Sequence, residues 1–155
     1  MIIKDSYCTK SNITEFELLG NDEIALSKAF SYLLSTNFNF FIIFLKSLGI
    51  KNFRIEKYFK TKISIETVHP WGRTDIEIES DDFQIIIECK ISNNKLIRQK
   101  TQYNNVFKAN KTNFICFITE EVQTELNTND DIHILYFSWF EILNMIEKPD
   151  LIMTN

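Results

Sequence analysis

The stretch that decides the fold is residues 72–91, GRTDIEIESDDFQIIIECKI. From Arg73 to Glu79 charged residues alternate strictly with threonine and isoleucine, which predicts a strand with carboxylates on one face and apolar side chains on the other. The two aspartates that follow predict a tight turn. The next expected strand is Phe83 to Ile91, and its Ile85–Ile87 run is apolar on both faces, as in a central strand covered on both sides.

Hydrophobic periodicity in the remaining chain predicts further helices and strands. Asn21 suits the N-cap of a first helix, Gly49 suits the position just after a second helix, and Ser138 suits the cap of a last one. The expected helices cover residues 23–35, 39–48, 95–109 and 139–147, and the expected strands cover residues 53–59, 62–68, 73–79, 83–91, 113–119 and 132–137. This order predicts an α/β fold, with a mixed central sheet flanked by helices.

Length and composition predict one folded domain covering residues 1–155. The chain has 45% hydrophobic residues and only three Gly and two Pro, which argues against linkers and disorder. Its net charge of -4 excludes a basic protein that coats nucleic acid, because such binding comes from Lys and Arg on phosphates. It does not exclude a nucleic-acid enzyme, because a bound divalent cation changes the charge of its site.

The cysteines and the apolar segments indicate the cellular compartment in which the protein works. Cys8, Cys89 and Cys116 are odd in number and widely spaced, which indicates neither a disulfide framework nor a metal pair. The start of the chain lacks the pattern of a signal peptide. The most apolar stretch, Phe38 to Leu45, is far shorter than the roughly 20 residues that span a bilayer. We therefore expect a soluble, cytoplasmic protein without a membrane partner.

Three charged side chains stand out in the two decisive strands. Glu88 and Lys90 are two residues apart, so they project from the same face of one strand, and the turn can bring Asp75 beside Glu88. Charges on a buried strand are costly unless they are paired or bind a metal. Two hard carboxylate ligands suit Mg²⁺ or Mn²⁺, with the backbone carbonyl of Cys89 as a further candidate ligand. Lys90 would orient or activate a metal-bound water, or neutralise charge in the transition state.

Three motifs in this order resemble the PD-(D/E)xK nuclease superfamily. They are Gly72-Arg73-Thr74-Asp75, Glu88-Cys89-Lys90 and, on the following helix, Gln99-Lys100-Thr101-Gln102-Tyr103. The first and third are similar to the forms found in the RecB-like branch, and Thr74 stands where the name-giving motif has proline. The helix that begins at Glu23 resembles the N-terminal helix of the family, whose glutamate often completes the metal site.

The resemblance implies both a fold and an activity. The fold would be a restriction-endonuclease-like core, with a mixed central sheet and helices on both faces. The activity would be divalent-metal-dependent cleavage of nucleic acid, more often DNA than RNA. The catalytic residues would be Asp75, Glu88, Lys90, Gln99 and Tyr103, and the metal ligands would be Asp75, Glu88, Cys89 and Glu23.

Basic residues suggest how substrate would be held. Arg73 could contact a phosphate from the loop before Asp75, although a surface salt bridge explains it equally well. Lys95, Arg98 and Lys100 belong to a basic segment that would steer phosphate towards the site. His69 and His133 are too far apart in the sequence to have zinc-ligand spacing.

Each candidate residue also has a simpler explanation. Asp75 would be one of a row of solvated acids, Glu88 and Lys90 an intrastrand ion pair, and Glu23 an acid that suits the helix dipole. The rival function is a nuclease-like fold that is idle or partner-dependent and acts in binding, regulation or defence. A homodimer formed through the apolar Phe38–Leu45 segment is a further hypothesis, with burial of this segment in the core as its alternative.

Overall fold

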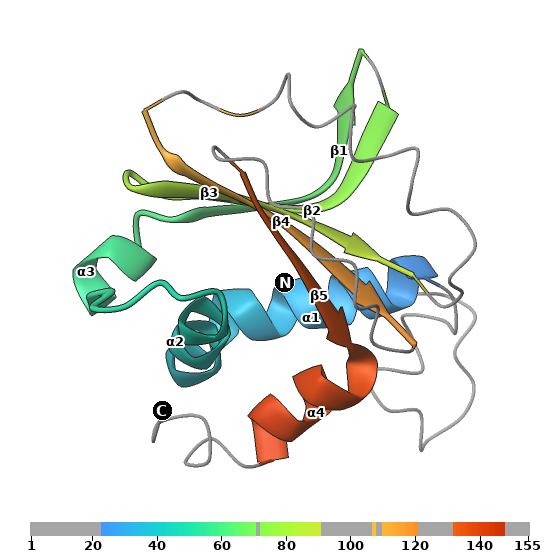
Figure 1. Ribbon diagram of the computed structural model, residues 1–155, viewed down its shortest axis with the longest axis horizontal. Helices are drawn as coiled ribbons and strands as arrows, with labels where there is room; N and C mark the ends of the chain where they lie inside the picture. Colours follow the sequence, from blue (N-terminus) through green and yellow to red (C-terminus); the bar gives the residue numbers. More distant parts are fainter. Residues whose placement is uncertain (1–22, 71, 91–106, 108–109, 121–131, 148–155) are drawn as a thin grey trace, which may run out of the picture.

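A computed structural model describes residues 23–70, 72–90, 107, 110–120 and 132–147. These residues form an α/β fold with one five-stranded sheet in the order β1-β2-β3-β4-β5 (Figure 1). The strands are β1 (Lys62–His69), β2 (Gly72–Glu79), β3 (Phe83–Cys89), β4 (Thr112–Thr119) and β5 (Ile132–Ser138). The helices are α1 (Glu23–Thr36), α2 (Phe38–Ser47), α3 (Ile55–Tyr58) and α4 (Trp139–Glu147).

The sheet is mixed, as the sequence predicts. β1, β2 and β3 are antiparallel neighbours, whereas β3, β4 and β5 run parallel. β3 is the central strand, and all of its residues are buried, which confirms the expectation drawn from its isoleucine run. The alternation in β2 is also confirmed, because Ile76 and Ile78 are fully buried, whereas the three acids that alternate with them are only partly buried: Asp75, Glu77 and Glu79.

The main hydrophobic core lies between one face of the sheet and three helices. Side chains of α1, α2 and α4 pack there against the inward residues of β2, β3, β4 and β5 (Figure 1). On the opposite face a smaller cluster contains Ile86, Ile115, Phe117 and Ile134, with Phe107 packed against it. The helix expected over residues 95–109 lies outside the described residues, apart from Phe107.

Both ends of α2 are capped, and the glycine that follows its C-terminus is the one that the sequence suggests. The Asn37 side chain accepts a hydrogen bond of 3.0 Å from the Phe40 N–H at the N-terminus. At the C-terminus Gly49 has φ of 83°, and the Ile50 N–H donates to the Leu45 carbonyl, which is the pattern of a Schellman motif. These caps fix where α2 begins and ends.

The apolar residues of α2 belong to the core. Its buried side chains are Phe40, Phe41, Ile43, Phe44 and Leu45. They pack with the inner face of the sheet and are therefore not available as a surface for a second copy of the chain. The alternative that this segment is core is confirmed.

The strand expected over residues 53–59 is wrong. Its centre forms α3, a single helical turn in which the Tyr58 N–H donates to the Arg54 carbonyl. The apparent alternation misleads because Ile55 and Phe59 are exposed, at 45% and 79%. Tyr58 instead packs its ring on Phe41, and its hydroxyl donates to the Leu34 carbonyl at 2.9 Å. These tertiary contacts outweigh the period-two pattern.

No single helix in the described part of the chain is long and apolar enough to cross a membrane. Only α1 and α2 taken together pass that test of length and composition, and the two are bent by 108° at the break between them. α2 lies in the hydrophobic core beneath the sheet.

Replacing Phe44 by alanine tests this core. Phe44 is fully buried and contacts the rings of Phe30 and Phe137, so Phe44→Ala should lower the free energy of unfolding by about 3–5 kcal/mol. The matched control is Phe59→Ala, because Phe59 is 79% exposed, and it should change that free energy by less than about 1 kcal/mol. Urea unfolding measures both, and equal losses would contradict the described core.

Candidate active site at the end of strand β3

The candidate site lies where β2 and β3 separate. Their pairing register ends at Ile76 opposite Ile87, so the next residues, Asp75 and Glu88, do not form a regular strand pair. Asp75 Oδ2 instead accepts a hydrogen bond of 2.8 Å from the Cys89 N–H. A side-chain carboxylate thus replaces the backbone partner that β3 loses when β2 turns away.

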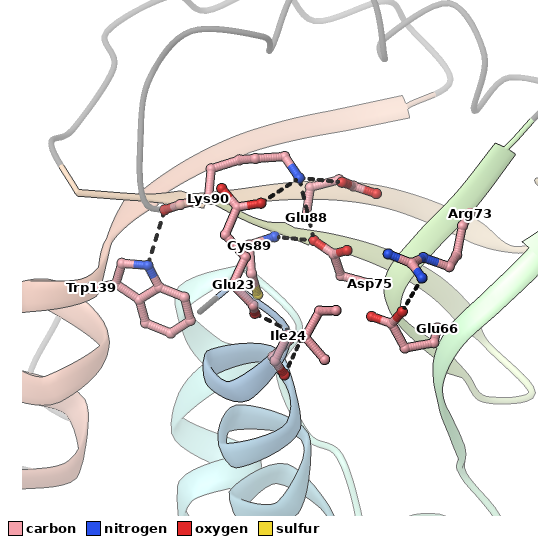
Figure 2. A network of polar contacts seen from close by, with 10 residues as sticks. Glu23, Ile24, Glu66, Arg73, Asp75, Glu88, Cys89, Lys90 and Trp139 are labelled. Carbon is pink, nitrogen blue, oxygen red and sulfur yellow. Dashed lines mark hydrogen bonds and ion pairs between the residues drawn. The ribbon is translucent and has the colours of Figure 1, made fainter. Parts of the chain in front are cut away.

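Three carboxylates converge on one ammonium at this point. Lys90 Nζ lies 3.5 Å from Glu88 Oε2, 3.6 Å from Glu23 Oε2 and 3.7 Å from Asp75 Oδ2 (Figure 2). Glu88 and Asp75 come from the two adjacent strands, and Glu23 is the first residue of α1. The structure therefore brings together four of the residues that the sequence singles out, including the glutamate suggested by the resemblance.

Burial makes this cluster more than a surface ion pair. The side chain of Glu88 is 1% exposed and that of Lys90 is 17% exposed. Burial alone would lower the pKa of the Lys90 ammonium, but Asp75, Glu88 and Glu23 outweigh it, so the pKa is raised. With three carboxylates around one ammonium, the cluster favours cations over anions.

The sulfur of Cys89 is unsuited to bind a metal or to act as a nucleophile. Burial, and then the charges of Asp75 and Glu88, raise the pKa of the Cys89 thiol well above its usual value. The thiol therefore stays protonated, and a protonated thiol is a poor metal ligand and a poor nucleophile. Because the N–H and C=O of a strand residue point to the same edge, the Cys89 carbonyl faces the Asp75 side. That carbonyl is the group that the sequence proposes as a ligand.

The backbone of Lys90 is held from both sides. Its N–H donates to the Ile118 carbonyl of β4 at 2.8 Å, and its carbonyl accepts from the indole Nε1 of Trp139 at 3.2 Å (Figure 2). Trp139 begins α4, where Ser138 and Glu141 form reciprocal cap hydrogen bonds. Sequence analysis misses Trp139, because nothing in a local pattern links it to a residue 49 positions earlier.

Arg73 is engaged in an ion pair on the neighbouring hairpin. Its Nη1 lies 2.7 Å from Glu66 Oε2 on β1 (Figure 2). The β1–β2 register places Glu66 opposite Asp75, between the pairs Ile65–Ile76 and Thr67–Thr74. The salt bridge considered for Arg73 is therefore present, and it lies at the edge of the site rather than elsewhere on the surface.

The backbone of Glu66 is unusual. Its φ of 52° lies in the left-handed region, which costs about 1–2 kcal/mol for a residue other than glycine. Its Oε1 is buried and has no hydrogen-bond partner among the described residues. An ion pair with Arg73, whose side chain is 52% exposed, contributes only about 0–1 kcal/mol. The ion pair alone does not account for this conformation.

Each of the two histidines contacts a neighbouring side chain. The His69 ring contacts Glu77 Oε1, which also accepts a hydrogen bond of 2.7 Å from the Thr74 hydroxyl. His133 stacks on Phe114, with 5.1 Å between ring centroids. Five further candidates, Lys95, Arg98, Gln99, Lys100 and Tyr103, lie outside the described residues.

The donor set suits a hard divalent cation. Carboxylate oxygens and a backbone carbonyl are the ligands that Mg²⁺ and Mn²⁺ prefer, and Mg²⁺ needs only one or two carboxylates. Asp75 and Glu88 each have a carboxylate oxygen within 3.7 Å of the Lys90 ammonium. Within the described ranges, no three His, Cys, Asp or Glu side chains are arranged to hold a metal ion together.

Comparison with known proteins identifies no family for this chain. No protein-family profile matches it, and no curated protein matches it in sequence.

The bond from the Cys89 N–H to Asp75 predicts different effects for two substitutions. Both substitutions remove the charge beside Lys90, but Asp75→Asn keeps an acceptor oxygen for the Cys89 N–H. Asp75→Ala leaves that N–H without its partner, so its free energy of unfolding should be about 1–3 kcal/mol lower than that of Asp75→Asn. Urea denaturation measures both variants. Equal stability of the two would show that this bond does not support the site.

Proposed function

We propose that the protein is a divalent-metal-dependent nuclease of the PD-(D/E)xK type with a restriction-endonuclease-like core. DNA is favoured over RNA as its substrate. The observation that carries this proposal is the convergence of Asp75, Glu88 and Glu23 on Lys90 at the point where two central strands separate. A mixed five-stranded sheet with helices packed on it supports the fold.

Each residue of the site has a distinct role in this proposal. Asp75 and Glu88 would hold Mg²⁺ or Mn²⁺, with the Cys89 carbonyl and Glu23 as additional ligands. The bound metal would lower the pKa of a water molecule and stabilise charge on the scissile phosphate. Lys90 would donate hydrogen bonds to that water or to a phosphate oxygen, where its fixed positive charge offsets the negative charge that develops.

The charge of the cluster explains why a metal would be required. Three carboxylates around one ammonium repel a phosphate diester, and the chain as a whole carries a net charge of -4. One divalent cation neutralises the net charge of -2 that three carboxylates and one ammonium carry together, so substrate and metal should bind cooperatively. Weak binding of nucleic acid without metal is the expected consequence.

Cleavage assays test this proposal directly. The purified protein should cut single-stranded DNA, duplex DNA or RNA when Mg²⁺ or Mn²⁺ is present and should not cut when EDTA is added. Asp75→Asn and Lys90→Ala should each reduce the cleavage rate by about 100-fold or more, because each removes a charge from the reacting centre.

The matched control is Lys57→Ala. Lys57 forms an ion pair with Asp82 at the turn between β2 and β3, outside the site. Its removal should leave the cleavage rate within about twofold of the wild type, since exposed ion pairs contribute little. Metal-dependent cleavage that survives in the Asp75 and Lys90 variants would assign the activity to another site or to a contaminant.

A second candidate function is a binding or regulatory protein with an idle site. The observation that favours it is the Lys90 ammonium itself, which already neutralises part of the carboxylate charge. In such a protein Lys90 would replace the metal instead of assisting it.

Metal-induced stabilisation distinguishes the two candidates. For a nuclease, Mg²⁺ at ten times its Kd should stabilise the fold by about 1.4 kcal/mol, a rise in Tm of roughly 3–6 °C. Asp75→Asn should abolish that rise, whereas Lys57→Ala should keep it. A thermal melt of the wild type that is unchanged by Mg²⁺ and by Mn²⁺ would favour the idle site.

A further inference from the structure

We infer that Glu66 is a positioning residue that holds the Arg73 guanidinium beside the site, where Arg73 contacts a phosphate of the substrate. This inference rests on the proposed nuclease function and extends it to the neighbouring hairpin. Under this inference Arg73 forms both the salt bridge and the phosphate contact, because the salt bridge orients its guanidinium towards the phosphate.

Strand geometry places Arg73 on the substrate side. Arg73 and Asp75 are two residues apart on β2, so their side chains project from the same face. Glu66 lies opposite Asp75 across the β1–β2 register and meets Arg73 at 2.7 Å. Figure 2 shows the Arg73–Glu66 pair next to Asp75 and the Lys90 cluster.

The ion pair leaves part of the guanidinium available. Arginine has five N–H donors in a planar fork, and the contact with Glu66 is made through Nη1. The Arg73 side chain remains 52% exposed. A guanidinium held at one nitrogen can present its other donors to a phosphate in a fixed direction, so less entropy is lost when substrate binds.

The conformation of Glu66 indicates a functional role. Its left-handed backbone and its buried Oε1 both destabilise the fold, and the half-exposed ion pair does not compensate for them. Strained backbone residues persist where their geometry serves a site. By contrast, neither member of the exposed Lys57–Asp82 ion pair has a positive φ, so this pair provides a matched control.

Binding of a labelled DNA oligonucleotide tests the inference, with Ca²⁺ in place of Mg²⁺ to limit cleavage. Arg73→Ala should weaken binding and reduce the slope of log K against log salt concentration by about 1, because one phosphate contact is lost. Glu66→Gln should weaken binding several-fold. If Glu66 merely competed with phosphate for Arg73, Glu66→Gln would bind more tightly, and that result would overturn the inference.

The double variant Glu66→Gln/Arg73→Ala tests whether the two residues act together. It should bind no more weakly than Arg73→Ala alone, since Glu66 acts through Arg73. In the cleavage assay Glu66→Gln should raise KM several-fold with little change in kcat. Asp82→Asn, the control, should change neither binding nor KM. Additive losses in the double variant would overturn the inference.

Stability gives a readout that does not depend on nuclease activity. Asparagine tolerates the left-handed region, so Glu66→Asn should raise Tm by about 2–4 °C while it weakens binding. Glu66→Gln keeps the strain and should not raise Tm. A Glu66→Asn variant that is no more stable than the wild type would refute the strain argument.

Failure of the nuclease proposal is distinguishable from failure of this inference. A wild type that binds the oligonucleotide but never cleaves it would overturn the nuclease proposal, while the effects on binding would still test Glu66. Cleavage by the wild type together with unchanged binding and KM in Glu66→Gln would overturn the inference alone.

Discussion

The structure depends on one electrostatic arrangement, the Lys90 ammonium among three carboxylates. Glu88 is an almost fully buried charge on the central strand, and such a charge is costly unless opposite charges and hydrogen bonds compensate for it. The ammonium also connects α1 to β2 and β3, because Glu23 and Asp75 meet it from different elements. The same contacts that make the buried charge tolerable also fix the position of the proposed reacting groups.

Much of the fold follows from residues 72–91 because period two is a strong signal where one face is buried. The alternation from Arg73 to Glu79 and the isoleucine run of β3 predict faces and burial that the structure confirms. The segment at residues 53–59 fails because its alternating apolar residues do not share a buried face, and Tyr58 finds partners that lie far away in the sequence. Tertiary contact decides such a short segment.

The residues of the site likewise fall into those that the sequence predicts and those that it does not. Asp75, Glu88 and Lys90 can be predicted because their spacing on adjacent strands fixes their common face. The roles of Trp139 and Glu66 cannot be predicted in this way. The role of Trp139 depends on where α4 begins relative to the end of β3. The role of Glu66 depends on a backbone conformation that glutamate rarely adopts, so no residue pattern predicts it. Groups that support a site through tertiary geometry are those that sequence patterns miss.

The mixed direction of the sheet has a consequence for the order of folding. The antiparallel hairpins from β1 to β3 join residues that are close in sequence, whereas parallel pairing joins residues 83–89 to 112–118 and closes a longer loop. The carboxylates of β2 and β3 can therefore gather early. Lys90 receives its backbone support from β4 and α4 only afterwards. During synthesis on the ribosome, the hydrogen bond from Trp139 to the Lys90 carbonyl can form only after α4 has emerged, so the backbone of Lys90 is fixed later than the carboxylates of β2 and β3.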